Sequence, residues 1–510
     1  MTAAHSPLVE DRPVTDRHFQ LGLRAAVLSL GCVFWVVGGM EMVERLAFYG
    51  VKAVAALYAT APKAEGGLGV SATIFGDVLM LWALTQSILP VVIGGLADRF
   101  GYKRTIFVST LVKISGYLVM AWFPSYWGFF CGALLLATGT AIFKPGIQGT
   151  LVHATKPENS SIAWGIFYQL VNVGGWIGPL LAAYLRSRLS WTSVFYSCAG
   201  IITCNFVLLT SYREPKLRDV GRVVYEESLW RVALRELSKL HVWTYLAAFT
   251  GFWFMFNALF DVLPLHVRDW VDTEQLVRFL FHGGRVENRI WRFLLGTNAQ
   301  GTQILPEGML NLNAGLIMTT CFAVAHLGSK LRATSSMIVG CVLAIVAMMM
   351  SGMSTVGTLS ALAILIFSVG EMLSSPKFSE FIGNFAPPDK TAMYLGFSQI
   401  PLAIGWTLEG KFGPMLYDHF ASKERFAREL LLERGMNVEQ VARIAPGEAF
   451  AHLVKFTHEP AARLTQLLYD THPVGHVWWL MAAFGALSVI GISLYAKFVI
   501  GNNTQREGEH

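Results

Sequence analysis

Long apolar runs, separated by short polar segments, follow one another along most of the chain. A helix needs about 20 mostly apolar residues to cross the hydrocarbon core of a bilayer. Twelve runs reach that length, and none alternates with the two-residue period of a transmembrane β-barrel. We therefore predict an all-α membrane protein with twelve transmembrane helices, at residues 27–58, 73–97, 104–122, 125–153, 159–185, 190–211, 241–267, 308–328, 332–353, 356–386, 391–417 and 476–499.

Charged residues interrupt the first of these runs. At about 100° per residue, one narrow face of the helix carries Glu41, Arg45, Phe48 and Lys52, with Glu44 and Tyr49 at its edges. An unpaired charge at the centre of a bilayer costs about 2.5–3.5 kcal/mol on insertion scales. We therefore expect these charges to pair with one another or to face a water-filled cavity.

Composition and the placement of charge agree with a membrane protein. Hydrophobic residues make up 54% of the chain and charged residues 15%, whereas soluble domains carry about 25% charged residues. The net charge of +6 does not indicate nucleic-acid binding, because the cations gather in the loops after the second, sixth and eighth runs. The positive-inside rule places these loops and both termini in the cytoplasm. Residues 1–22 lack the layout of a secretory signal peptide.

Three connections are longer than the others. Residues 268–307 and 418–475 are predicted to be external insertions with short helices, and residues 213–240 a cytoplasmic linker with a basic amphipathic helix. None contains a phosphate-binding glycine loop, a nucleophile elbow or a metal-ligand spacing, so we expect neither an enzyme nor a metal site. All six cysteines lie in predicted helices, where we expect them to pack without forming disulfides.

The two halves of the chain share a loop. Residues 94–104 read Gly-Gly-Leu-Ala-Asp-Arg-Phe-Gly-Tyr-Lys-Arg, and residues 325–332 form a weaker copy at the corresponding place. The first closely resembles the loop G-x-x-x-D-R-x-G-x-K/R of the major facilitator superfamily. Asp98 and Arg99 are then gating residues, which pair with neighbouring helix ends and release during a rocking motion. The expected domains are a tail (1–22), a six-helix bundle (23–212), the linker, a second bundle (241–500) and a tail (501–510).

Four motifs carry a narrower resemblance, and they occur in order over most of residues 30–410. They read E-M-V-E-R-L-A-F-Y-G at 41–50, F-K-P-G-I at 143–147, F-Y-Q-L-V-N-V-G at 167–174 and G-E-M-L-S-S-P at 370–376. Together they resemble the motifs of the proton-dependent oligopeptide transporters, and their co-occurrence makes the resemblance specific.

This resemblance implies roles for individual residues. The acidic and basic groups that take part in proton coupling are Glu41, Glu44 and Arg45. The two cations that face the substrate carboxylate are Lys52 and Lys144, and the carboxylate that meets the substrate amino group is Glu371. The remaining substrate-binding candidates are Tyr49, Tyr168, Asn172, Asn257, Asp261 and Asn313.

The seventh helix departs from the family pattern. Asn257 and Ala258 stand where that family ordinarily carries Glu-Gln, so the usual acidic partner of Lys144 is missing. Asp261 lies one turn later and is one candidate partner for Lys144. Glu44 is the other.

The function expected from these observations is secondary transport. We expect a carrier of the inner cell membrane that imports di- or tripeptides, or a similar zwitterionic solute, with protons as the coupling ion and no cofactor. No ATP-binding loop of the G-x-x-x-x-G-K-S/T type occurs in the chain. Two alternatives stay open: a facilitator-type exporter of drugs or metabolites, and a membrane receptor or scaffold that transports nothing.

Overall fold

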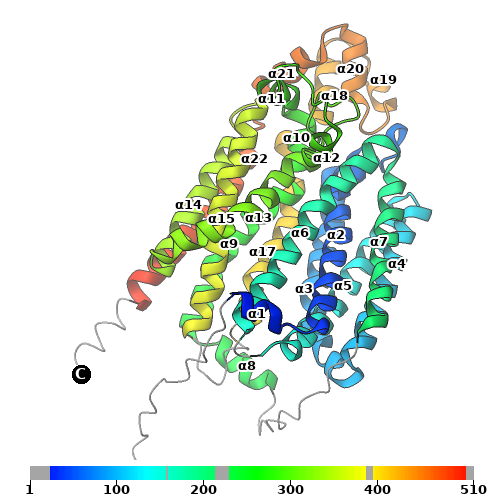
Figure 1. The fold of residues 1–510 in the computed structure, drawn as a ribbon. Helices are drawn as coiled ribbons and strands as arrows, with labels where there is room; N and C mark the ends of the chain where they lie inside the picture. Colours follow the sequence, from blue (N-terminus) through cyan, green and yellow to red (C-terminus); the bar gives the residue numbers. More distant parts are fainter. Residues whose placement is uncertain (1–22, 157–158, 213–228, 386–393, 395, 501–510) are drawn as a thin grey trace, which may run out of the picture.

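The structure is a computed structural model, which describes all residues except 1–22, 157–158, 213–228, 386–393, 395 and 501–510. Most described residues are helical and none of them forms a strand of a sheet, which confirms the all-α prediction (Figure 1). Twelve helices of this described part have 19 to 29 residues. They are α2 (Cys32–Thr60), α3 (Ala72–Phe100), α4 (Tyr102–Trp122), α5 (Tyr126–Ala154), α6 (Ser160–Arg188), α7 (Trp191–Ser211), α9 (Leu240–Asp261), α13 (Pro306–Ser329), α14 (Ala333–Ser351), α15 (Gly357–Phe385), α17 (Gln399–Ala421) and α22 (His476–Tyr495).

Two of the predicted runs are broken in the structure. The run at 27–58 divides into α1 (Leu23–Ser29) and α2, with Gly31 in an extended conformation between them. The run at 241–267 divides into α9 and α10 (Leu263–Trp270). Pro264 lies in the first turn of α10, a position that suits proline because its missing N–H would have no partner there. Hydropathy alone carries no signal for either break.

Nine of the long helices in the described residues are apolar enough over 18 residues to cross a membrane. The other three are α2, α13 and α17, and each of them carries buried charged or amide side chains. Such side chains are costly in lipid and therefore face the protein interior or a wet cavity. Polar groups for a site can therefore come from these three helices, and also from α4 and α9, which carry the buried charges Lys113 and Asp261.

The long helices pack as two groups in chain order. In the first, α2 packs on α6 and α7, and α4 packs on α5 and α7. In the second, α9 packs on α17 and α22, and α14 packs on α15 and α22. The groups meet where α3 packs on α17 and α6 packs on α13. The predicted domain boundaries at 1–22, 213–240 and 501–510 stay predictions, because these segments lie wholly or largely outside the described residues.

Glycines allow close approach at two places. At Gly101, φ is +92°, a conformation that side chains disfavour, and it turns the chain between α3 and α4. Where α3 crosses α17, a Cβ added at Gly76 would lie 2.9 Å from the carbonyl oxygen of Gly410. The two helix backbones therefore touch, as is common where small residues meet between membrane helices.

Short helices of the two insertions cover one end of the molecule. They are α11 (Thr273–Leu280), α12 (Arg289–Leu294), α18 (Lys423–Glu433), α19 (Val438–Arg443), α20 (Ala449–Thr457) and α21 (Ala461–Thr471). Side chains cap the start of four of them, namely Asp272, Asn288, Ser422 and Asn437. We call this covered end the capped end, and α1 and the amphipathic linker helix α8 (Leu229–Leu237) lie at the opposite end (Figure 1).

Candidate functional site

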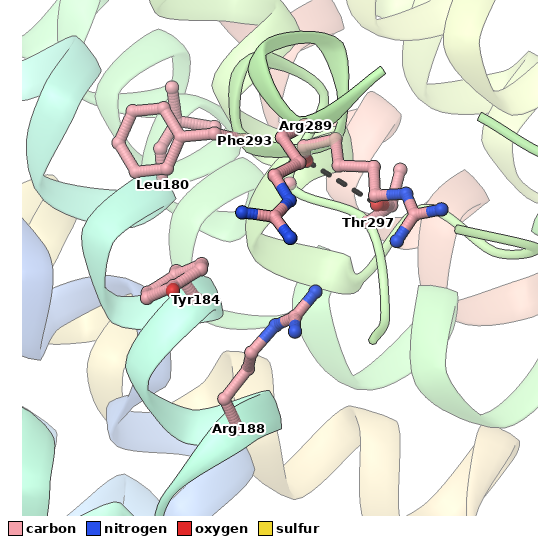
Figure 2. A pocket seen from close by; sticks show the side chains of 8 residues that line it. Leu180, Tyr184, Arg188, Arg289, Phe293 and Thr297 are labelled. Atoms are coloured by element: carbon pink, nitrogen blue, oxygen red, sulfur yellow. Dashed lines mark hydrogen bonds between the residues drawn. The ribbon is translucent and has the colours of Figure 1, made fainter. Parts of the chain in front are cut away.

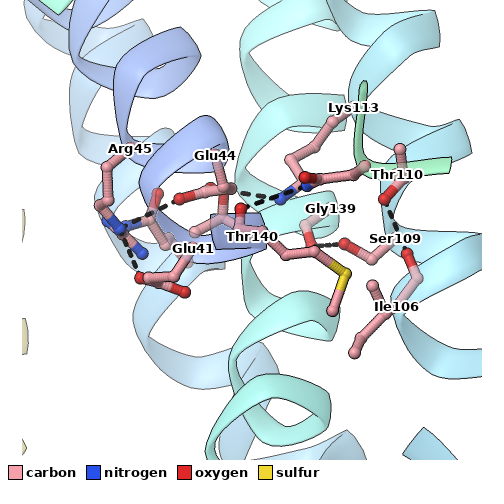
Figure 3. A network of polar contacts seen from close by, with 12 residues as sticks. Glu41, Glu44, Arg45, Ile106, Ser109, Thr110, Lys113, Gly139 and Thr140 are labelled. Atoms are coloured by element: carbon pink, nitrogen blue, oxygen red, sulfur yellow. Dashed lines mark hydrogen bonds and ion pairs between the residues drawn. The ribbon is translucent and has the colours of Figure 1, made fainter. Parts of the chain in front are cut away.

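An ion-pair network lies inside the first helix group, around the charged stripe of α2 (Figure 3). The Nε hydrogen of Arg45 is donated to Glu41 at 2.7 Å, one helical turn earlier. The same nitrogen lies 3.0 Å from Glu44 Oε2, as an ion pair without a hydrogen bond. Lys113 of α4 donates to Glu44 Oε1 at 3.2 Å, and Thr140 of α5 donates to the same oxygen at 3.3 Å. The expected pairing of the stripe is therefore present.

Lys113 was not predicted from the sequence, although it is one of the best-buried charges in the described residues. Its side chain is 1% exposed, and its ammonium lies 3.7 Å from the centre of the Phe143 ring. A lysine near the middle of the predicted 104–122 helix was the available signal. The two carboxylates of the network, Glu41 and Glu44, are then balanced by two cations, Arg45 and Lys113.

Lys144 adds a third cation beside this balanced network. It lies within α5 next to Pro145, and the charges of Arg45, Glu41 and Glu44 act on it. No carboxylate of the described residues forms an ion pair with it. The region around the network therefore contains an amino group that has no ion-pair partner of its own among the described residues, and this group can hold an anion.

Glu371 of α15 is the corresponding feature of the second group. One of its oxygens accepts a hydrogen bond from Asn313 of α13 at 2.9 Å, and that amide also donates to Ser368 at 3.0 Å. Among the described residues no cation pairs with Glu371. A carboxyl group without a cationic partner among the described residues thus lies in the second group, and the amide of Asn313 orients it.

Polar groups of the first group lie towards Glu371. The charge of Glu371 acts on Tyr49 of α2 and on Tyr168 of α6. Tyr168 is 53% exposed and lies within hydrogen-bonding reach of Asn172, one turn along α6. Polar side chains of α6 therefore lie on the side of the first group nearest to Glu371.

Lys52 and Asp261 form a separate pair between the groups. The Lys52 ammonium contacts the Asp261 carboxylate, and it lies 4.9 Å from the centre of the Trp406 ring. Asp261 is thus the partner of Lys52 in the structure and not of Lys144, in keeping with the contact between α9 and α2. Asn257 donates to the carbonyl of Trp253 in its own helix at 2.6 Å. These residues do not join the network around Glu44.

Among the described residues, most ion pairs between the groups lie towards the capped end. Arg186 of α6 holds Glu307 of α13 with two hydrogen bonds, of 2.6 and 3.0 Å. Between α3 and α17, Thr73 donates to Asp418 at 2.8 Å near the same end, and Lys411 pairs with Asp77 deeper along the two helices. The structure is therefore closed at the capped end. Asp98 and Arg99 lie near the other end of α3, and their side chains are outside the described residues.

A cavity of about 350 Å³ lies elsewhere, between α6 and the 268–307 insertion (Figure 2). Arginines and aromatic rings line it, including Tyr184, Arg188, Arg289, Arg292 and Phe293. No sequence motif pointed to it, and it is separate from the residues predicted to bind substrate. In the described part of the chain, no group of three or more histidine, cysteine or acidic side chains could hold a metal ion.

Comparison with known proteins fits this architecture. The family model described as Major Facilitator Superfamily matches residues 45–408, more than half of the chain. The multidrug resistance protein MdtH of Photorhabdus laumondii is 23% identical over 357 residues, which cover 69% of this chain and 79% of that protein.

Solved structures of transporters share the fold. A peptide transporter POT in complex with sulfate has a TM-score of 0.61 at 15% identity, covering 92% of this chain and 99% of that one. A bacterial homologue of the human lysosomal transporter Spinster, inward-facing and unoccupied, has a TM-score of 0.65 at 16% identity, covering 91% and 96%.

Spanning helices in two groups, with paired charges buried between and within them, define a multi-pass membrane transporter and not an enzyme. The chain belongs to the Major Facilitator Superfamily.

Proposed function

We propose that this transporter imports a small zwitterion, most simply a di- or tripeptide, together with protons. The observation that carries the proposal is that Lys144 in the first group and Glu371 in the second each lack an ion-pair partner among the described residues. A free peptide has a carboxylate at one end and an ammonium at the other. It can therefore neutralise both charges at once and hold the two groups together, which neither a simple anion nor a simple cation can do.

The network around Glu44 supplies the proposed proton coupling. Arg45 holds both Glu41 and Glu44, and Lys113 and Thr140 hold Glu44 from the other side. Removing or adding one cation beside such a pair changes the proton affinity of the carboxylates. We propose that a substrate carboxylate at Lys144 redistributes this balance, which links substrate binding to proton binding on Glu41 or Glu44.

The family resemblance supports the same substrate class. The four motifs resembling oligopeptide transporters contain Glu44, Lys144, Asn172 and Glu371, and these residues lie in or beside the charged regions described above. Peptide transporters are among the proteins that share this fold. We propose location in the inner cell membrane with the capped end outside, so that the structure is closed to the outside.

Export of drugs or metabolites is the second candidate function. Its support is the similarity to MdtH, a multidrug resistance protein. An exporter of apolar compounds has no need of two opposite, uncompensated charges that face one substrate. The direction of transport in proteoliposomes under an imposed proton gradient separates the two functions.

Binding of dipeptides by purified protein tests the substrate class. A ligand that binds only the folded state raises its melting temperature, so a free dipeptide should stabilise the protein more than the N-acetylated dipeptide. Glu371→Gln should weaken binding of the free dipeptide about 10- to 100-fold, because a charge-assisted hydrogen bond contributes about 1.5–3 kcal/mol.

The matched control is Glu380→Gln on the same helix, since Glu380 is 49% exposed and pairs with Lys377. It should bind the free dipeptide like the wild type. Equal losses for the free and acetylated dipeptides in Glu371→Gln would contradict contact between Glu371 and an ammonium. A wild-type protein that binds no dipeptide would favour the exporter.

A further inference from the structure

Glu409 of α17 is a buried acidic group that no motif or role described so far includes. It is 0% exposed, and both of its carboxyl oxygens lack a hydrogen-bond partner among the described residues. An ionised carboxylate in such a place loses the hydration of two oxygens and gains no donor in return, which is among the most costly arrangements in a folded protein.

Helix α17 is shaped to accept this side chain. Gly413 lies one turn after Glu409, and a Cβ added at Gly413 would collide with Glu409 Oε1. The Glu409 side chain therefore lies over Gly413. Val262, which joins α9 to α10, lies beside the same glycine. The absent side chain at position 413 creates room for a carboxyl group but supplies no hydrogen-bond donor.

The charges around Glu409 do not balance it. Asp261 of α9 and Lys52 of α2 are the charged groups that act on it, and they already pair with each other. Asp261 is further occupied by Trp406, whose indole N–H donates to its second oxygen at 3.3 Å. Two carboxylates thus share a single ammonium in a site where Lys52, Asp261 and Glu409 are 7%, 2% and 0% exposed.

The remaining helices packed on α17 do not supply a second cation within this site. On α3 the acidic residue Asp77 pairs with Lys411, which lies two residues beyond Glu409 towards the capped end. On α22 the titratable residues of the described helix are His476 and Tyr495, which lie at its two ends. A proton is then the remaining species that can balance the second carboxylate.

We propose that Glu409 and Asp261 form a proton-binding carboxyl pair, and that its proton content is linked to the Lys52–Asp261 contact between the two helix groups. In the closed-end structure, Lys52 balances Asp261 and one proton resides on Glu409. When the capped end opens, Lys52 leaves with the first group and Asp261 loses its cation. Asp261 then binds a second proton from the water that enters, and closure returns that proton to water as Lys52 comes back.

The site thus ties proton uptake to opening of the capped end. Its role in solute import rests on the function proposed above, whereas the protonation of Glu409 does not. The two ideas fail separately, because the tests below need no substrate.

The state of Glu409 is measured by infrared spectroscopy on the purified full-length protein at pH 7. A protonated carboxyl group in a dry interior gives a C=O stretching band that is distinct from the bands of a carboxylate, and Glu409→Gln should remove one such band from the wild-type spectrum. The control is Glu307→Gln, since Glu307 is equally buried but held by Arg186. It should remove no such band. An unchanged band in Glu409→Gln would overturn the proposal.

Thermal stability gives an independent readout if a spectrum cannot be assigned. Glu409→Gln replaces one neutral group by another of similar shape and should leave the melting temperature at pH 7 unchanged. Asp261→Asn removes the partner of Lys52 and should lower it clearly. An equal loss in both variants would mean that Glu409 is ionised and shares Lys52, which overturns the proposal.

The link to opening is tested by distance measurements between spin labels at positions 73 and 418 on the capped end, over a pH series. Acidification should shift the wild-type population towards the longer distance. Asp261→Asn, which cannot take up the second proton, should abolish this shift. A pH response of Asp261→Asn equal to that of the wild type would show that the pair does not drive opening.

Discussion

Glu44 shows how single residues are held in this transporter. Its side chain is 0% exposed, and Arg45, Lys113 and Thr140 surround its two oxygens. In a low-dielectric interior, losing one partner of an ion pair costs more than the pair contributes, because the other charge stays behind unpaired. The pairing of Glu44 therefore depends on Lys113, a residue two helices further along the chain.

Replacing Lys113 by methionine tests this dependence. The change leaves Glu44 with Arg45 as its only cation, and breaking a buried pair in this way costs about 3–5 kcal/mol unless Glu44 binds a proton instead. We expect a large fall in melting temperature at pH 7 that is partly recovered at lower pH. The control is Lys377→Met, because its partner Glu380 is 49% exposed and such pairs contribute about 0–1 kcal/mol. Equal shifts in the two variants would contradict the argument.

Single charged residues can be predicted from the sequence where burying their charge would be costly. The four charges of α2 were conspicuous because they cluster in an apolar run, and the structure does pair them. Lys113 stands alone in the apolar stretch of α4, and Glu409 has only Lys411 near it in α17, which pairs with Asp77 of α3. The surroundings of both residues are therefore set by other helices. The partner of Lys52 likewise depends on how α2 meets α9, which local pattern does not contain.

At the scale of elements, the two insertions pack on each other to form the cap. Lys423 of α18 donates to the carbonyl of Asp269 at 2.8 Å and to Thr465 of α21 at 2.7 Å. Its ammonium also lies 3.9 Å from the centre of the Phe450 ring. One lysine thus connects the 418–475 insertion to the chain that leaves α10. The sequence predicted short helices here from their polarity but gave no sign of this contact.

The stability of the cap should depend on pH through Lys423. Burial lowers the pKa of Lys423 from its ordinary value of 10.5 to about 8. Between these values the unfolded chain binds more protons than the folded protein, so stability should rise as pH increases from about 8 to 10.5, by on the order of 3 kcal/mol at most. Lys423→Met should lack this rise. Melting curves of both proteins over this pH range measure the difference.

The matched control for that comparison is Lys455→Met, a change at an exposed lysine of helix α20 in the same cap. It should keep the rise of the wild type. A wild-type protein whose stability, relative to Lys423→Met, falls or stays constant between pH 8 and 10.5 would contradict the assignment of a buried, weakened ammonium.

At the scale of the whole molecule, the two helix groups are held together at one end by contacts of unequal strength. The Arg186–Glu307 pair has two hydrogen bonds, and its side chains are 20% and 0% exposed. The Lys411–Asp77 pair is 33% and 45% exposed, so water competes with it. The fold and its helices followed from periodicity and length, whereas these cross-group pairs depend on tertiary packing and were not predicted.

The equilibrium between the closed and open states of the capped end should therefore depend much more on Glu307 than on Asp77. Glu307→Gln leaves Arg186 with a neutral partner in a mostly dry site, and we expect the closed end to lose about 2 kcal/mol, roughly a 30-fold change in the closed-to-open ratio. Asp77→Asn should change the ratio by less than about fivefold, since exposed pairs contribute at most about 1 kcal/mol.

Hydrogen-exchange mass spectrometry of peptides covering 180–190 and 295–308 measures the opening directly. Glu274→Gln is the control, because Glu274 pairs with Arg278 within α11 and does not join the two groups. Faster exchange in Asp77→Asn than in Glu307→Gln would reverse the ranking and place the main closing contact at the crossing of α3 and α17.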